Sequence, residues 1–313
     1  MEELMGIRET YGKTLAELGG DNQDIVVLDA DLSGSTKTAD FAKKYPERFF
    51  NMGVAEQDLM TTAAGFAAAG KIPFASTFAI FATGKAFEQI RQSVAYTNLN
   101  VKVVSTHAGV TVGEDGGSHQ AIEDIALMRS LPNMTVLVPG DGIEMREIIR
   151  EVAKYKGPVY VRGARNKYPI VFDDSYKFEI GKAVTVRPGK DATIIACGFM
   201  VSQSLKACDI LKEKGYDVGL VNMSTIKPID KDAIINAAKE TGAIITAEEH
   251  NIIGGLGSAV AEVLSENYPC LLKRVGIKDI FGKSGTAKML IDKYGLLPEN
   301  VVEATLEVIN KKG

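Results

Sequence analysis

Residues 25–30 read IVVLDA, an apolar and mostly β-branched run, and the polar segment DLSGST follows it at 31–36. A strand that is apolar at successive positions is covered on both faces, as in a parallel sheet. Helical patterns lie on either side of this run, at about 2–18 and 54–69. The stretch therefore predicts an α/β fold with a parallel sheet between helices.

The same alternation continues along the chain of 313 residues. Strand-like runs lie at 101–107, 134–140, 158–163, 192–198, 217–223, 243–250 and 271–277. Helices are expected at about 82–96, 119–130 and 142–155, then from about 201, 230 and 255, with a last one from 298 to about 311. The pattern breaks in the polar stretch between 170 and 190. We therefore predict two domains, 1–170 and 190–313, joined by a linker at 171–189, each a mostly parallel sheet covered by helices.

Composition limits the classes of function. The chain is 45% hydrophobic and 24% charged, with a net charge of −4 and no basic block, which argues against a nucleic-acid partner. Cys197, Cys208 and Cys270 lack metal-type spacing and are expected to be reduced thiols. No apolar run reaches transmembrane length, and the start MEELMGIRET is too acidic for a signal peptide. These features predict a soluble cytoplasmic protein without a membrane partner.

Glu56 stands out in FNMGVAEQDLMTTAAGFAAA (50–69). On a helix it shares its face with four apolar side chains, Leu59, Met60, Ala63 and Ala64. Asp58 lies on another face. Burial of Glu56 would favour its protonated form. The alternative is a first-turn acid that the helix dipole stabilises. The helical pattern alone leaves both interpretations open.

Ligands of open parallel sheets bind at the carboxyl ends of the strands. The polar residues at those ends are Asp31, Ser35, His107, Asp115, His119, Arg162 and Arg165. The strongest signal is the loop HAGVTVGEDGGSHQ (107–120), which holds two of the three histidines and four glycines. Such a loop can bring imidazoles and backbone close to a small polar ligand. The alternatives are a turn-rich loop with solvated histidines and, less favoured, a metal site.

Three further motifs suggest binding functions; two of them have a structural alternative, and the third, GDG, is discounted. In PFASTFAIFATGKAF (73–87), Phe78 and Phe81 either pack in the core or stack on a flat heterocycle. The stretch GDG (140–142) imitates a magnesium–diphosphate signature, but Asn166 is followed by Lys167 in place of a second asparagine. The stretch GGLGSAV (254–260) imitates a dinucleotide loop, but Val260 replaces the third glycine, so a tight turn explains it as well.

Several motifs together resemble one family. NMGVAEQ (51–57), PFASTFAIF (73–81) and GEDGGSHQ (113–120) are similar to the pyrimidine-binding domain of transketolase. AEEHNIIGGLGSAVAE (247–262) resembles the carboxyl-terminal domain of the same family. Full transketolases begin with a diphosphate-binding half that carries the metal, whereas this sequence starts just before the pyrimidine domain. It therefore resembles the carboxyl-terminal subunit of a split transketolase.

The resemblance implies a catalytic role for three residues. Glu56 matches the glutamate that hydrogen-bonds a ring nitrogen of the thiamine diphosphate aminopyrimidine. Asp115 matches the residue that accepts a hydrogen bond from the donor's hydroxyl next to the carbonyl. His119 matches the contact to the hydroxymethyl end of the donor ketose.

Binding roles follow from the same resemblance. Phe81 matches the ring that stacks on the pyrimidine, with Phe78 beside it, and Asp31 matches an acid near the cofactor at the subunit boundary. The sugar phosphate is expected on Arg8, Ser35, His107 and Arg165, with Arg162 as a competitor of Arg165. Gly84 stands where a third aromatic is often found, so the pyrimidine pocket is expected to differ in detail. No metal ligand is expected on this chain.

The implied activity is transfer of a two-carbon ketol unit from a ketose phosphate to an aldose phosphate. A separate diphosphate-binding subunit would share the thiamine diphosphate and carry Mg or Ca, and this chain would also self-associate, giving a heterotetramer. The alternatives are the beta subunit of a 2-oxo-acid dehydrogenase, a half of a deoxyxylulose-phosphate synthase, and a non-catalytic scaffold or regulatory paralogue. The phosphate ligands favour sugar phosphates, and the joint presence of the implied site residues argues against the paralogue.

Overall fold

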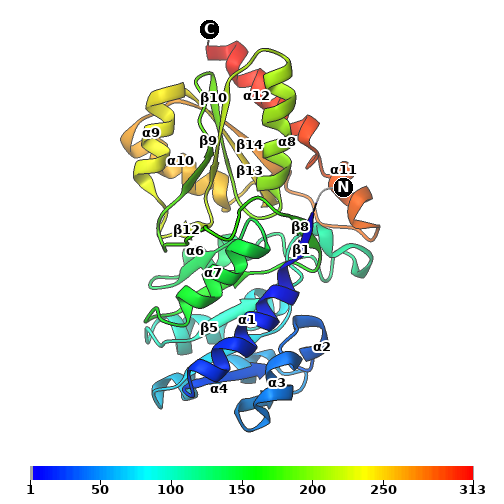
Figure 1. The fold of residues 1–313 in the computed structure, drawn as a ribbon, viewed down its shortest axis with the longest axis vertical. Helices are drawn as coiled ribbons and strands as arrows, with labels where there is room; N and C mark the ends of the chain where they lie inside the picture. The colour runs from blue at the N-terminus through cyan, green and yellow to red at the C-terminus, as the bar shows by residue number, and fades with distance from the viewer. Residues whose placement is uncertain (1–2, 313) are drawn as a thin grey trace.

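The computed structural model describes residues 3–312. Figure 1 shows two α/β units, each a sheet with helices on both faces, that follow one another along the long axis of the molecule. The first sheet has the strand order β12-β6-β7-β5-β4-β2-β3, and all its pairs are parallel except β12 with β6. Its strands are β2 (Ile25–Asp29), β3 (Phe49–Asn51), β4 (Ile72–Ser76), β5 (Lys102–Ser105), β6 (Thr135–Leu137), β7 (Val159–Arg162) and β12 (Thr225–Lys227). The expected parallel sheet is confirmed.

Helices cover both faces of this sheet, because its strands are apolar on both sides. One face packs against α1 (Ile7–Asp21), α3 (Ala39–Lys44) and α7 (Gly142–Val152). The other packs against α4 (Glu56–Ala68), α6 (Asp124–Ser130) and the π-helical turn η3 (Ile90–Ala95). The short helices α2 (Ser33–Thr36), η1 (Pro46–Arg48) and η4 (Val110–Asp115) lie in connecting loops.

The second sheet has the order β14-β13-β10-β11-β9, with only β9 antiparallel. Its strands are β9 (Val184–Arg187), β10 (Ala192–Ala196), β11 (Val218–Asn222), β13 (Ala243–Asn251) and β14 (Leu271–Ile277). The helices α8 (Met200–Glu213) and α12 (Pro298–Lys312) cover one face, and α9 (Lys231–Thr241) and α10 (Leu256–Asn267) cover the other. The short helix α11 (Ala287–Lys293) contacts η4 of the first domain.

Several expected elements differ in detail. Residues 4–6, expected to be helical, form β1 (Leu4–Gly6), which pairs with β8 (Lys167–Pro169). The helix expected at 119–130 begins only at Asp124, because Ala121 pairs with Ala108 in an isolated bridge. The helix expected at 82–96 is a π-helical turn η2 (Phe81–Lys85), then α5 (Phe87–Gln89), then η3.

The division into 1–170, 171–189 and 190–313 stays a prediction. Strand β9 lies within the segment that we expected to be irregular, and it joins the second sheet. Strand β12 comes from the second half of the chain but joins the first sheet. One apolar cluster also runs from α4 and α6 to α9 and α10, so the two halves share part of their core. No helix within residues 3–312 is long and apolar enough to span a membrane.

Glu144 of α7 connects this helix to the second half of the chain. Its carboxylate accepts hydrogen bonds from the Gly140 N–H at 2.6 Å, the Tyr176 hydroxyl at 2.5 Å and the Asn222 side-chain amide at 2.8 Å. Burial nevertheless raises the pKa of Glu144 from 4.5 to about 7. A carboxyl whose pKa is raised by folding stabilises the fold below its unfolded pKa, and that contribution is lost as pH rises through the folded pKa.

We therefore expect Glu144→Gln to flatten the pH dependence of stability between about pH 4.5 and pH 7. The wild-type chain should lose on the order of 3 kcal/mol more than the variant across this window. Urea unfolding at a series of pH values measures the difference. Glu147→Gln, which changes a partly exposed carboxylate of the same helix, is the control. An unchanged pH profile in Glu144→Gln would contradict the assignment.

Candidate active site

The aromatic and imidazole side chains of two expected motifs meet in one cluster. Phe78 stacks on His107, with ring centroids 3.8 Å apart and planes 20° apart. Phe81 lies 5.9 Å from Phe78 and 5.4 Å from the ring of His119. Phe78 is buried and its face is covered by His107, whereas Phe81 is partly exposed. Core packing therefore describes Phe78, and Phe81 has ring surface available to a ligand.

Glu56 is the first residue of α4, and its side chain is only 3% exposed. The apolar face expected around it is present, since Leu59, Met60, Ala63 and Ala64 are all buried. Its carboxylate Oε2 lies 2.5 Å from Nζ of Lys85. This is the only hydrogen bond of the Glu56 side chain to any residue within 3–312. A buried acid thus faces a half-exposed ammonium group.

Lys85 was missed by the sequence analysis. It ends the π-helical turn η2, which begins at Phe81 and contains Gly84. A π-turn holds one residue more than an α-turn and is frequent at functional sites. At Gly84 a Cβ would meet only Ile80, at 3.9 Å. The position expected to hold a third aromatic is therefore open space.

Positive charges surround His107. The residue has a φ of 60° and is 3% exposed, and its Nδ1 lies 2.8 Å from the Thr106 hydroxyl. Burial, with Arg8, Arg165 and His119 close by, lowers the pKa of His107 to about 3. The imidazole is therefore neutral at neutral pH, while the guanidinium groups keep their charge. Such a group can accommodate an anion.

Arg8 and Arg165 reach this group from different elements. Nη1 of Arg8, on α1, donates to the carbonyl oxygen of Ser35 at 3.0 Å. Nη1 of Arg165 donates to the Val112 carbonyl at 2.5 Å and lies 3.8 Å from Oδ1 of Asp115. The side chain of Arg165 is 34% exposed, so part of its guanidinium remains available to a ligand. The structure thus brings together Arg8, Ser35, His107, Asp115, His119 and Arg165.

Arg162 is held by internal contacts. Its Nε donates to Asp124 at 2.8 Å, and its Nη2 donates to the carbonyl oxygens of Ala121 and Glu249. Only 6% of the residue is exposed. The geometry therefore favours Arg165 over Arg162 as an anion ligand.

Asp31 is not joined to the cluster by any contact within residues 3–312. Its carboxylate accepts a hydrogen bond at 2.9 Å from the side-chain amide of Asn51, the last residue of β3. The sequence analysis missed the neighbouring Asp29, which is fully buried. Asp29 accepts hydrogen bonds from Leu32 N–H, Thr36 and Thr38 and thereby orders the loop that carries Ser35. Its place at the end of an apolar strand, before a Ser/Thr-rich turn, was the available signal.

The two stretches that imitate cofactor-binding signatures, GDG (140–142) and GGLGSAV (254–260), have structural roles. Asp141 of GDG caps α7 by accepting from Glu144 N–H, and it also accepts from the N–H groups of Val171 and Phe172. In GGLGSAV, the N–H groups of Leu256 and Gly257 donate to the carboxylate of Glu248. A Cβ at Gly255 would lie 2.0 Å from Oε2 of Glu248. The tight-turn interpretation is confirmed, because the helix start is occupied by the chain's own carboxylate.

Within residues 3–312, no three His, Cys, Asp or Glu side chains are grouped in a way that could hold a metal ion. The three cysteines are free thiols, with Cys197 and Cys208 buried.

Comparison with known families gives two matches that together span most of the chain. Residues 4–171 match the family described as transketolase, pyrimidine binding domain. Residues 181–301 match the family described as transketolase, C-terminal domain.

Individual proteins with similar sequences or structures are described as transketolases as well. The chain is 52% identical over 310 residues to a putative transketolase C-terminal section of Methanocaldococcus jannaschii, covering 98% of this chain and 97% of that protein. It is 40% identical to a 6-deoxy-6-sulfo-D-fructose transketolase subunit of a Clostridium species, covering 98% and 95%. A solved structure described as a split gene transketolase, inactive beta4 tetramer, superposes with a TM-score of 0.93 at 53% identity, covering 99% of this chain and all of that one.

Proposed function

This chain belongs to the transketolase family, and from that premise we propose that it is the carboxyl-terminal subunit of a split, thiamine diphosphate-dependent transketolase. The observation that carries the proposal is the buried carboxylate of Glu56, which contacts Lys85 of η2, the turn that begins with the partly exposed Phe81. The second subunit would supply the diphosphate half of the site together with Mg or Ca. The cytoplasmic location stays a prediction.

The residues present fit the aminopyrimidine end of the cofactor. A flat heterocycle requires an aromatic face, which Phe81 offers, and a partner for a ring nitrogen, which Glu56 offers. The absence of a side chain at Gly84 leaves open space in the same turn as Phe81. When bound, thiamine diphosphate would supply the carbon nucleophile that protein side chains lack.

Glu56 would hold a proton between its carboxylate and the ring nitrogen of the cofactor. Lys85 has to release the carboxylate for this contact to form. The side chain of Lys85 is 48% exposed, so its ammonium can turn into water, and the ring nitrogen would then replace it as the partner of the buried carboxylate. The apolar surroundings of Glu56 exclude water from the shared proton.

The other side chains would bind and orient the two sugars. Asp115 and His119 would contact the hydroxyl groups near the donor carbonyl. Arg8, His107 and Arg165 would bind the anionic end of each sugar, with Ser35 beside them. We propose a phosphate at that end. The Clostridium relative is named for a sulfonated sugar, and a sulfonate is a related oxyanion that the same guanidinium groups could bind.

Assembly is part of the proposal. The split-gene relative is described as an inactive beta4 tetramer, which supports self-association of this chain and inactivity without its partner. The active complex would be a heterotetramer of two copies of this chain and two copies of the diphosphate-binding subunit.

The proposed function is tested with purified chain and candidate amino-terminal subunit, in the presence of thiamine diphosphate and magnesium. Ketol transfer from xylulose 5-phosphate to ribose 5-phosphate is expected from the mixture. Decarboxylation of 2-oxo acids, with or without transfer to a lipoyl group, is measured in parallel. Activity only on 2-oxo acids would favour the dehydrogenase alternative, and a stable complex with neither activity would favour the non-catalytic paralogue.

Arg165→Met is expected to raise the KM for a phosphorylated donor by about 10²-fold, since a charge-assisted hydrogen bond contributes roughly 1.5–3 kcal/mol. The KM for a short donor without phosphate, such as erythrulose, should change little. Steady-state kinetics of the assembled complex measure both values. Equal losses on the two donors would contradict a role for Arg165 at the phosphate.

A further inference from the structure

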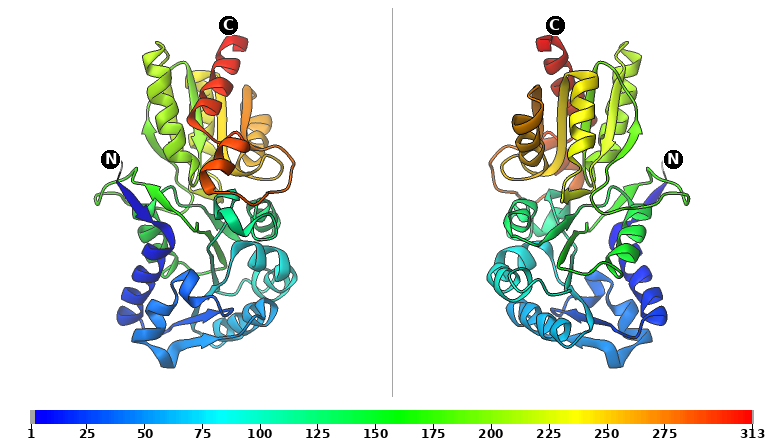
Figure 2. Two further views of the ribbon diagram at one scale, coloured as in Figure 1. Left: turned by 90° about the vertical axis from the view of Figure 1, so that its right-hand side faces the viewer. Right: turned by 90° about the vertical axis from the view of Figure 1, so that its left-hand side faces the viewer.

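The loop from His107 to Gln120 is held by the second half of the chain on two sides. On one side, the Gln120 amide donates to the Lys283 carbonyl at 3.0 Å. A Cβ at Gly117 would lie 2.7 Å from the Gly282 carbonyl oxygen, so the two backbones touch. Figure 2 shows this segment, drawn in orange after β14, reaching down beside the teal loop.

On the other side, Glu249 of β13 enters the loop. Its Oε1 accepts the N–H of Thr111 at 2.7 Å, across 138 positions of sequence. Gly109 has a φ of 80°, and a Cβ there would lie 2.2 Å from Oε1 of Glu249. Glu249 is 2% exposed and lies within β13, two residues before the end of the strand. The glycine is therefore required by the backbone conformation and by the close approach of the acid.

The contact falls within the loop that carries three of the candidate site residues. Thr111 lies in the first turn of η4, midway between His107 and Asp115. Nothing else within residues 3–312 accepts the Thr111 N–H. Loss of the carboxylate would leave a buried donor unpaired, which costs about 1–3 kcal/mol and loosens the segment that contains it.

We propose that Glu249 is a positioning residue for the active site: it fixes the loop that carries His107, Asp115 and His119 and thereby sets the affinity for the donor sugar. This inference rests on the function proposed above. It also gives the carboxyl-terminal domain a part in a site that the pyrimidine-binding domain forms. Glu249 touches neither sugar nor cofactor in this account and acts through the Thr111 amide.

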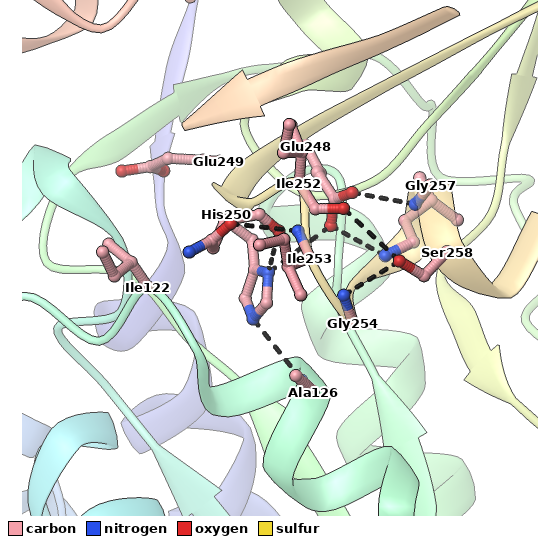
Figure 3. A network of polar contacts seen from close by, with 12 residues as sticks. Ile122, Ala126, Glu248, Glu249, His250, Ile252, Ile253, Gly254, Gly257 and Ser258 are labelled. Atoms are coloured by element: carbon pink, nitrogen blue, oxygen red, sulfur yellow. Dashed lines mark hydrogen bonds and ion pairs between the residues drawn. The ribbon is translucent and has the colours of Figure 1, made fainter. Parts of the chain in front are cut away.

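Glu248 provides a matched comparison. It is the preceding residue, it is equally buried, and it also accepts backbone N–H groups. Figure 3 shows the two carboxylates on opposite sides of the strand, with Glu248 toward the start of α10 and Glu249 away from it. Glu248 holds the start of α10, whereas Glu249 holds the loop. Substitution of Glu248 therefore shows the effect of losing a buried acid that does not contact the loop.

The first test is hydrogen exchange of the isolated chain, which requires no catalysis. In Glu249→Ala, amides of residues 109–115 should exchange at least about tenfold faster, because the acceptor of a buried N–H is gone. Glu249→Gln keeps an acceptor oxygen and should return the loop to within about twofold of wild type. Glu248→Ala should accelerate exchange at the start of α10 and leave the loop unchanged. Unchanged loop exchange in Glu249→Ala, or equal acceleration in Glu248→Ala, would overturn the proposal.

The second test is kinetic and uses the assembled complex. Glu249→Ala should raise the donor KM by about tenfold or more, with Glu249→Gln close to wild type and the affinity for thiamine diphosphate unchanged in both. A loosened loop with unchanged donor KM would overturn the link to donor affinity. An inactive wild-type complex with the expected exchange pattern would contradict the proposed function and the link to donor affinity, while the loop contact would stand.

Discussion

Glu56→Gln is expected to lower the rate of ketol transfer by the assembled complex by roughly 10²–10⁴-fold, the range over which positioned proton-transfer groups contribute. The amide has nearly the same shape as the carboxyl, but it cannot take up or return a proton at the ring nitrogen. Because the Glu56 side chain is only 3% exposed, solvent water has little access to take over the proton transfer in the variant. The measurement is kcat under saturating cofactor, with cofactor binding followed separately.

Asp58→Asn is the matched control for this substitution. Asp58 lies two positions further along α4 and is exposed. The control should keep nearly full activity. A decrease in kcat of less than about tenfold in Glu56→Gln, or an equally large decrease in Asp58→Asn, would contradict the role given to Glu56.

Arg162→Met is expected to destabilise the chain by about 3–5 kcal/mol, because it leaves the buried carboxylate of Asp124 without its counter-ion. The two side chains are 4% and 0% exposed, with Nε and Oδ2 2.8 Å apart. The substitution also removes donors to the Ala121 and Glu249 carbonyl oxygens, which lie in different halves of the chain. Urea unfolding measures the change in the free energy of unfolding.

Arg165→Met separates stability from ligand binding. Arg165 is 34% exposed, so its loss should change the free energy of unfolding by less than about 1 kcal/mol. The double variant Arg162→Met with Asp124→Leu should recover part of the stability, since both buried charges are then gone. Similar destabilisation by Arg162→Met and Arg165→Met would contradict the different roles that the structure indicates for them.

The parallel sheets were predictable because their strands are short, apolar runs between helical patterns. The same reasoning placed His107, Asp115, His119 and Arg165 at one edge, since parallel strands end together. Helical spacing placed Glu56 on the apolar face of its helix, but it left open whether Glu56 is a functional buried acid or a first-turn acid that the helix dipole stabilises. These inferences all use residues that are close in sequence or strands that follow one topological rule.

The remaining features depend on contacts between distant residues. The pairing of β12 with β6 joins segments from different halves of the chain, and no local pattern indicates it. The π-turn that brings Lys85 to Glu56 adds one residue to a helix, which a period of 3.6 does not reveal. The internal hydrogen bonds of Arg162 are made to Asp124 and Glu249, which are 38 and 87 positions away in the sequence.

The central claim is that this chain supplies one half of an active site that a second chain completes. Ketol transfer from xylulose 5-phosphate to ribose 5-phosphate, recorded while this chain is titrated into a fixed amount of the amino-terminal subunit, tests it most directly. With saturating thiamine diphosphate and magnesium, the rate should start at zero, rise linearly and reach a plateau at an equimolar ratio. Full activity of this chain alone, or a rate that does not depend on its addition, would contradict the account.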